Sequence, residues 1–277
     1  MTAKAPEKNS RRVAVILGAG GSSRTLLDQL YPLLGNRRNV EVQGVFLEEA
    51  EIQHAAELPF VKELCRVTFS VREFNSDQFE HALNLRMRTA RRALSVLARR
   101  TGVSHTFRNV RSTAVSLVQE TASAADITVF EPVRLIAANL AQPARTARPR
   151  QRIVVVIDDL ETAGMTLLAA GQLAEGIMDR VTVITIAPVA GDSAQLDEVL
   201  RKTLPARPSV RPAPGSDFAS LIQAVQREGA TMLVLGASDR ILDRGVLREL
   251  RQQLRCPICL VRRWGDSRKA RSAVKAH

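Results

Sequence analysis

The chain has 277 residues, of which 45% are hydrophobic, and a formal net charge of +12. This length allows two ordinary domains with a buried core each, and no apolar run approaches the ~20 residues that a membrane-spanning helix needs. The opening residues MTAKAPEKNSRR lack the apolar centre of a signal peptide, so we expect a cytoplasmic protein.

The positive charge is concentrated in three short segments. Residues 1–12 carry four basic residues and one acidic residue, 143–152 carry four arginines, and 262–277 carry six basic residues and one acidic residue. These segments account for the whole formal charge. A nucleic-acid-binding domain usually carries its charge on a folded face with stacking aromatic residues, and aromatic residues make up only 4% of this chain. We therefore expect solvated tails and a linker, with attachment of the tails to RNA, DNA or an acidic lipid surface as the alternative.

In the first half, strands and helices are predicted in alternation. The expected elements are a strand at Val13–Leu17, a glycine-rich turn at Gly18–Ser23, a helix that ends near Leu34 and is capped by Gly35, a strand at Val40–Phe46, a short helix in Leu58–Leu64 after Pro59, a helix from Asp77 to Gly102, a strand at His105–Val110, a helix at Thr113–Ala122, a strand at Ile127–Phe130 and a helix at Val133–Leu140. The basic segment 143–152 follows as a linker.

The pattern then begins again. The expected elements are a strand at Ile153–Ile157, a helix that continues to about Leu173, a strand at Val181–Ile186, a helix at Gln195–Leu204, a weak edge strand at Val210–Pro212, a helix at Asp217–Arg227 capped by Ser216, a strand at Met232–Gly236, a helix that carries Val246, Leu247, Leu250 and Leu254, and a strand at Ile258–Val261.

The two halves form an internal repeat. VAVILGAGGSSRTLL aligns with IVVVIDDLETAGMTLL, and ASAADITVFEP aligns with REGATMLVLGA. Strands that alternate with helices predict a parallel sheet covered on both faces. The expected fold class is therefore α/β, with two tandem doubly wound domains at 11–142 and 153–262, and basic tails at 1–10 and 263–277. Ligands of such sheets bind at the carboxyl ends of the strands, which places a site in the loop after Gly236.

These residues resemble a tandem universal stress protein. In the second half, Ile157-Asp158-Asp159 resembles the end of that family's first strand, Ala230–Gly236 its fourth strand, and Cys256-Pro257-Ile258 the start of its last strand. In the first half, Gly44–Glu49 and Leu58–Phe60 resemble a form with a long insertion after the second strand. The resemblance implies five parallel strands per domain, in an adenine nucleotide alpha hydrolase-like fold. It also implies a homodimer through the last strand, here Ile258–Val261; because the first half lacks such a strand, pairing within or between chains stays open.

The nucleotide-binding members of that family carry Gly-x2-Gly-x9-Gly-Ser/Thr after the fourth strand, where backbone amides hold phosphates. Here Gly236 fills the first position and Asp239 the second, and Arg244 and Gly245 fall on the last two. Asp158 matches the position that recognises adenine. The residues that we expect at a cofactor site are Asp158, Asp159, Gly236, Ser238, Arg240, Arg244 and Gly245, for ATP or for no cofactor at all. In the first half, Gly18 replaces the aspartate and Phe130-Glu131-Pro132 replaces the glycine.

Catalytic chemistry has weaker support. Gly18–Arg24 also resembles the glycine-rich opening of nucleotidyltransferases, but no lysine occurs between Lys8 and Lys62 to complete such a site. The Cys256–Cys259 spacing is typical of redox proteins, yet it falls between a helix end and a strand, which favours structural cysteines. No metal ligands or catalytic residues are expected.

Three hypotheses follow. The first is a non-enzymatic stress-response or regulatory protein of the universal stress protein type, which acts through an unknown protein partner and has a decayed nucleotide site. The second is an ATP-responsive switch, in which nucleotide orders residues 237–245 of the second domain. The third is a polyanion-binding protein that uses its basic tails.

Overall fold

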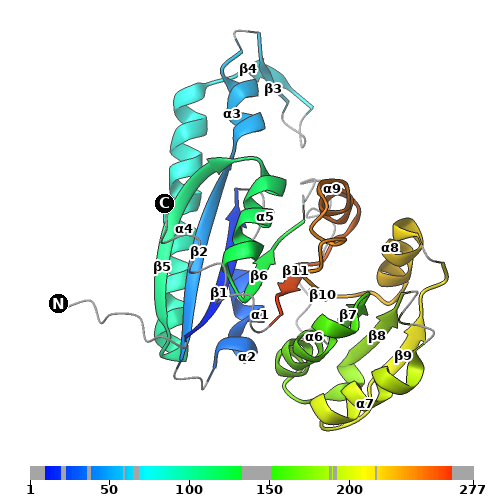
Figure 1. The fold of residues 1–277 in the computed structure, drawn as a ribbon. Helices are drawn as coiled ribbons and strands as arrows, with labels where there is room; N and C mark the ends of the chain where they lie inside the picture. Colours follow the sequence, from blue (N-terminus) through cyan, green and yellow to red (C-terminus); the bar gives the residue numbers. More distant parts are fainter. Residues whose placement is uncertain are drawn as a thin grey trace, which may run out of the picture.

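A computed structural model describes residues 10–19, 23–35, 39–58, 60–64, 69–132, 151–186, 189, 192–215 and 217–263. These residues form one nine-stranded sheet, with strand order β5-β2-β1-β6-β11-β10-β7-β8-β9, and a separate two-stranded hairpin (Figure 1). Helices cover both faces of the large sheet, which is parallel except at one junction. The α/β class and the doubly wound arrangement are confirmed.

The first half supplies four parallel strands, in the order β5-β2-β1-β6. They are β1 (Arg11–Gly18), β2 (Val40–Glu49), β5 (Ser104–Ser112) and β6 (Ile127–Phe130). The helices of this half are α1 (Ser23–Gln29), α2 (Tyr31–Leu34), α3 (Ala50–Ala56), α4 (Ser76–Thr101) and α5 (Ala114–Ala124). The hairpin of β3 (Lys62–Leu64) and β4 (Val71–Glu73) lies between α3 and α4 in the chain.

The second half supplies five parallel strands, in the order β11-β10-β7-β8-β9. They are β7 (Ile153–Ile157), β8 (Val181–Thr185), β9 (Ser209–Pro212), β10 (Met232–Gly236) and β11 (Ile258–Val261). Between them lie α6 (Leu160–Leu173), the short 3-10 helix η2 (Met178–Arg180), α7 (Ser193–Thr203), α8 (Phe218–Arg227) and α9 (Arg244–Gln253).

The two halves are joined by an antiparallel pair of strands. β11 lies beside β6, with Ile258 opposite Phe130 and Val261 opposite Ile127, and the Arg262 N–H donates to the Asp126 carbonyl oxygen at 2.9 Å. The last strand of the second half therefore closes the sheet of the first half, so the pairing that the sequence left open forms within the chain. β10 and β6 occupy both edges of β11, and a second copy could pair with it only by displacing one of them.

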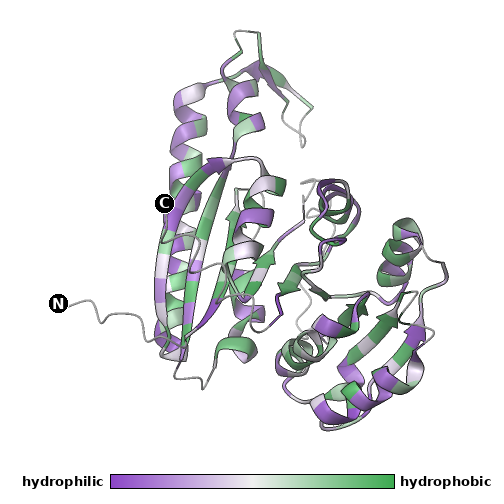
Figure 2. Cartoon of the chain, viewed as in Figure 1, coloured by the Kyte–Doolittle hydropathy of each residue, from purple (hydrophilic) through white to green (hydrophobic). Residues whose placement is uncertain are grey.

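The core consists of two apolar layers, one on each face of the sheet. One layer is made by α1, α2, α4, α6 and α7, and the other by α5, α8 and α9. β7, β10 and β11 are buried on both faces, and Figure 2 shows them as mainly hydrophobic. This explains why each has a continuous apolar sequence rather than an alternating one.

One local prediction was wrong. Leu58–Leu64 is not a helix: α3 ends at Ala56, and Lys62–Leu64 forms β3. Lys62–Leu64 pair with Val71–Glu73 of β4 instead, and such pairing overrides a local helical tendency. Gly35 caps the helix that ends at Leu34, as predicted: its N–H donates to the Tyr31 carbonyl oxygen at 2.9 Å, with φ −60° and ψ 141°. The predicted helix at 133–140 and the Ser216 cap lie outside the described residues.

Candidate functional site

The candidate site is a cleft of about 610 Å³ at the carboxyl ends of β7 and β10. The first turn of α6 and residues 237–242 form two of its walls, and residues 122–123 of α5 and 262–263 after β11 form the others. The cleft thus lies where a parallel sheet binds ligands. Because α5 belongs to the first half, both halves contribute to it.

Asp158 and Ser238 meet inside this cleft. The Ser238 hydroxyl donates to Asp158 Oδ2 at 2.6 Å, while Asp158 Oδ1 is buried without a hydrogen-bond partner among the described residues. Burial raises the pKa of Asp158 above its ordinary value, and the Ser238 hydrogen bond opposes that rise. Two of the residues that we expected at a cofactor site therefore lie in contact here.

Asp159 has a structural role. It is the N-cap of α6, and its Oδ1 accepts the Glu161 N–H at 2.9 Å. This satisfies one of the amides that a helix start leaves unpaired. Asp159 therefore lines the cleft, but its carboxylate already accepts a hydrogen bond from the protein backbone.

Close packing against Thr162 accounts for the glycine at position 236. A Cβ atom at this position would collide with Thr162 Oγ1 and lie 2.8 Å from Thr162 Cβ. β10 and α6 can approach this closely only because residue 236 has no side chain. The glycine therefore does not by itself indicate a phosphate site.

The loop after β10 is held by its own hydrogen bonds. The Leu242 N–H donates to the Ser238 carbonyl oxygen at 2.9 Å, and the Ile241 N–H donates to Ser238 Oγ at 3.3 Å. From the first half, Gln119 Nε2 donates to the Leu242 carbonyl oxygen at 2.7 Å. Ile241 is fully buried. The loop is thus anchored on both sides without any ligand.

The start of α9 is capped by the protein itself. Asp243 Oδ1 accepts the Gly245 N–H at 2.8 Å and the Val246 N–H at 3.2 Å. These are the amides that a phosphate would need at this helix start. Arg244 and Gly245 do not line the cleft, whereas Arg240 does. Of the seven predicted residues, Asp158, Asp159, Ser238 and Arg240 are brought together there.

The cleft carries charges of both signs. Asp239 adds an acid beside Asp158 and Asp159, and Arg262 and Arg263 add cations next to Arg240. The guanidinium of Arg262 donates to the Ser123 carbonyl oxygen, and that of Arg263 pairs with Glu161.

The sequence pattern did not indicate several residues that line this cleft or hold its walls. Arg263 was assigned to a basic tail, and Thr162, Gln119 and Ser123 were not singled out. All four act through contacts with residues far away in the chain. No local pattern in the sequence could have identified them.

A second, smaller cavity of about 240 Å³ lies at the corresponding strand ends of the first half. Gly18 stands there where the second half has Asp158, and most of the lining is apolar, with Phe79 and Leu83 contributed by α4. Arg251 of α9 reaches across the two halves and pairs with Glu49 at 3.2 Å. The cavity therefore provides no cluster of phosphate-binding groups among the described residues.

Cys256 and Cys259 are free and buried. Burial raises the pKa of Cys256 to about 11 and that of Cys259 to about 12. Because the thiolate is the reactive form, these thiols are poor nucleophiles at neutral pH. This environment agrees with structural cysteines rather than with a redox pair.

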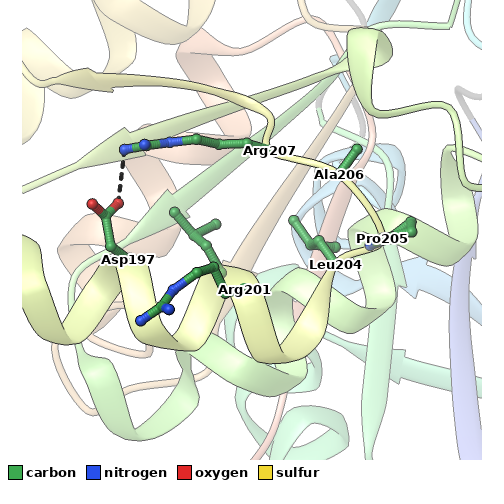
Figure 3. A pocket seen from close by; sticks show the side chains of 7 residues that line it. Asp197, Arg201, Leu204, Pro205, Ala206 and Arg207 are labelled. Carbon is green, nitrogen blue, oxygen red and sulfur yellow. Dashed lines mark hydrogen bonds and ion pairs between the residues drawn. The ribbon is translucent and has the colours of Figure 1, made fainter.

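A crevice of about 290 Å³ lies beside the C-terminal part of α7. Figure 3 shows Arg207 reaching toward Asp197, with 2.8 Å between Arg207 Nη2 and Asp197 Oδ1. Residues 204–207 lead into the amino end of β9, so this crevice lies at the end of the sheet opposite to the cleft. It does not take part in the candidate site.

Among the described residues, no group of three or more His, Cys, Asp or Glu side chains has a metal-binding arrangement. Within the same residues, none of the helices combines the length and the apolar character needed to cross a membrane.

No family model and no curated protein matches the chain. Among solved structures, the chain is similar to a universal stress protein from Archaeoglobus fulgidus DSM 4304, with 10% identity and a TM-score of 0.45 over 91% of this chain and 97% of that one. It is also similar to histidinol dehydrogenase from Elizabethkingia anophelis, with 14% identity and a TM-score of 0.28 over 83% and 49% of the two chains. With TM-scores below 0.5, these likenesses add nothing to the fold that the strand order shows.

Proposed function

We propose that this chain is a non-catalytic regulatory protein of the universal stress protein type, which acts by binding a protein partner and whose nucleotide site has decayed. The observation that carries the proposal is the cap of α9, where the Asp243 carboxylate accepts the Gly245 and Val246 N–H groups. A phosphate at this helix start would have to displace a carboxylate that is already part of the fold.

Charge supports the same conclusion. Asp239 lines the cleft at the second glycine position of the nucleotide motif, and a carboxylate there repels phosphate. The two other cations that line the cleft are engaged by protein groups, Arg262 by the Ser123 carbonyl oxygen and Arg263 by Glu161. A triphosphate would therefore gain little binding free energy in this cleft, because the contacts of Arg262 and Arg263 with protein groups would first have to be broken.

The chemistry of the cleft supports a binding role rather than a catalytic one. Among the described residues, no histidine or cysteine lines it, and Asp158 is engaged by Ser238. A catalytic site usually combines a nucleophile or base with an orienting partner. The groups here mainly hold the loop and the start of α6.

The test is calorimetric titration of the protein with ATP, ADP and AMP at millimolar concentration, together with thermal shift. We expect no heat of binding and no rise in melting temperature. A ligand at 100 times its Kd would stabilise the fold by about 2.7 kcal/mol, so a site that fills at these concentrations is easily detected. Saturable binding of ATP would overturn the proposal.

An adenine-nucleotide switch is the second candidate, and one observation favours it. Asp158 Oδ1 is buried at the cleft without a described hydrogen-bond partner, and such an atom accepts a hydrogen bond from an amino group. If wild-type protein binds ATP and the Asp158→Asn variant does not, the switch replaces the first proposal. The Asp197→Asn variant, in the crevice at the opposite end of the sheet, is the matched control.

A further inference from the structure

An arm projects from the first half, at the end of the molecule where α4 begins (Figure 1). We define it as the described residues of 50–75. α3 has no buried residue, and all six residues of β3 and β4 are exposed. A two-stranded hairpin with no packed face is marginally stable in water. Among the described residues, no other element therefore packs over the exposed surface of the arm.

The exposed side chains of the arm include large hydrophobic ones. Phe60 is 75% exposed and Phe69 is 77% exposed, and Ile52, Leu64 and Val71 are also exposed. Leu64 lies opposite Val71 in the hairpin, so these two side chains share one face of it. Exposed apolar surface of this kind marks an interaction site.

Helix α4 has a strongly asymmetric charge. Its first ten residues, 76–85, contain Asp77 and Glu80 and no lysine or arginine. The remaining residues, 86–101, contain no acid and six arginines: Arg86, Arg88, Arg91, Arg92, Arg99 and Arg100. The helix dipole favours this sign order only within the first and last turns. It does not explain the arginines in the middle of the helix.

Most of these charges point away from the buried face of α4; the exceptions are Arg86, which donates to the Ala19 carbonyl oxygen, and Arg100, which pairs with Asp28. The buried residues of α4 are Ala90, Leu94, Leu97 and Ala98. Within the part of the chain that the structure describes, no ion pair is found for Arg88, Arg91 or Arg92, nor for Asp77 or Glu80. A row of residues at helical spacing, His81, Leu85, Arg88, Arg92, Val96 and Arg99, runs opposite the buried face. In that row Leu85 and Val96 are exposed apolar residues.

We propose that two copies of this chain form a homodimer in which their α4 helices lie antiparallel. At 1.5 Å per residue, α4 is about 39 Å long. An antiparallel arrangement places the acidic end of each helix beside the arginine-rich end of the other, whereas a parallel one places like charges together. The contact is self-complementary, as a twofold interface must be.

The arm completes this interface. Residues 50–85, which comprise the arm and the acidic end of α4, carry six acidic and three basic residues in a chain of net charge +12. In the antiparallel dimer each arm lies over the arginine-rich end of the other helix, beside its exposed Val96. Charge and apolar surface are both matched by a second copy. This dimer does not depend on whether the cleft binds nucleotide, and it leaves the β6–β11 pair intact.

Sedimentation of the wild-type protein over a range of concentrations and salt tests the dimer. At low salt we expect a dimer, and in roughly 1 M NaCl, where the Debye length is about 3 Å, we expect its Kd to rise on the order of tenfold or more. A monomer at about 100 μM protein in low salt would overturn the proposal, because an interface of standard size binds more tightly than that.

Charge reversal then tests the antiparallel geometry. The variant Asp77→Arg/Glu80→Arg makes α4 basic throughout, and Arg88→Glu/Arg92→Glu/Arg99→Glu replaces all three arginines of the row opposite the buried face with acids. We expect each variant alone to be monomeric and an equimolar mixture to form a heterodimer, since both contacts then pair opposite charges. Loss of the dimer without restoration in the mixture, or no loss in either variant, would overturn the geometry. Arg227→Glu/Arg248→Glu, on α8 and α9, is the control, and circular dichroism verifies folding.

Discussion

Gly236 at the end of β10 lies against Thr162 in the first turn of α6, so closely that a Cβ atom at residue 236 would be 2.8 Å from Thr162 Cβ. The contact joins the strand that leads into the cleft to the helix that follows β7. In a ligand-binding motif, a glycine at a strand end is usually taken to let the backbone come close to a phosphate group. Here close packing alone requires it.

The first prediction concerns this contact. Gly236→Ala overpacks the strand and helix, and we expect a loss of about 1–3 kcal/mol in the free energy of unfolding. Thr162→Ala in the same chain removes the hydroxyl and methyl groups and should recover part of that loss. Chemical denaturation measures both. Gly18→Ala is the matched control: Gly18 ends β1, and no atom lies within 4 Å of the position that a Cβ would take there. This change should alter stability by no more than about 1 kcal/mol.

The second prediction concerns the cap of α9. Asp243→Ala leaves the Gly245 and Val246 N–H groups without their acceptor, and we expect a loss of about 0.5–2 kcal/mol in unfolding free energy. Asp243→Asn keeps an acceptor oxygen and should remain close to wild type. Equal losses in the two variants would show that the carboxylate charge, rather than the cap, matters at this position.

The third prediction concerns pH. Burial raises the folded-state pKa of Asp158 above 3.8, so the folded protein binds this proton more tightly than the unfolded chain does. The stabilising contribution is fully present below the unfolded pKa and is lost as pH rises through the folded pKa. Asp158→Asn removes this dependence. Its unfolding free energy relative to wild type should therefore increase as pH rises through that window.

A carboxyl titration followed by NMR checks the cause. The Ser238 hydroxyl donates to Asp158 and lowers its pKa, so Ser238→Ala should raise the Asp158 pKa further. A pKa unchanged or lowered in this variant would contradict the hydrogen bond.

The fourth prediction concerns the thiols. With pKa values of about 11 and about 12, Cys256 and Cys259 carry on the order of one thiolate per thousand molecules or fewer at pH 8. In a Cys65→Ser background, a thiol reagent should leave the native protein unlabelled and label two cysteines after denaturation. Rapid labelling of the native state would contradict their burial.

The fifth prediction concerns cooperativity. Because β11 pairs with β10 on one side and β6 on the other, loss of this strand opens the sheets of both halves. We expect a single calorimetric transition, with equal calorimetric and van't Hoff enthalpies. Val129→Pro, which removes an N–H from β6 opposite Cys259, should lower the temperature of that one transition. Two separate transitions in the wild type would contradict the joint sheet.

The sequence predicted the elements with strong local patterns. β6, β7 and β11 have the predicted bounds, because strands buried on both faces are continuous apolar runs. The long helix ends as expected at Gly102, which has φ 70°. The segment Leu58–Leu64 was mistaken for a helix because a hairpin with no buried face has no alternating pattern to reveal it.

The candidate site was predictable only in part. Asp158 and Ser238 follow two strands that are neighbours in a parallel sheet, so their meeting could be inferred from strand order. The role of Asp243 as a helix cap was not predicted, because the positions of the nucleotide-binding motif fall on the next two residues, Arg244 and Gly245. The contributions of Gln119 and Arg263 depend on residues that are far away in the sequence.

By itself, then, the sequence determined the α/β class, the repeat of its two halves and the strands that lead into the cleft, because these depend on short-range hydrophobic periodicity. Only the tertiary structure decided that β11 pairs with β6 within the chain, and that Gln119 and Arg263 hold the loop after β10 and the first turn of α6. These contacts depend on which edges and surfaces meet in space, and they join residues that are far apart in the sequence. No local pattern of residues encodes them.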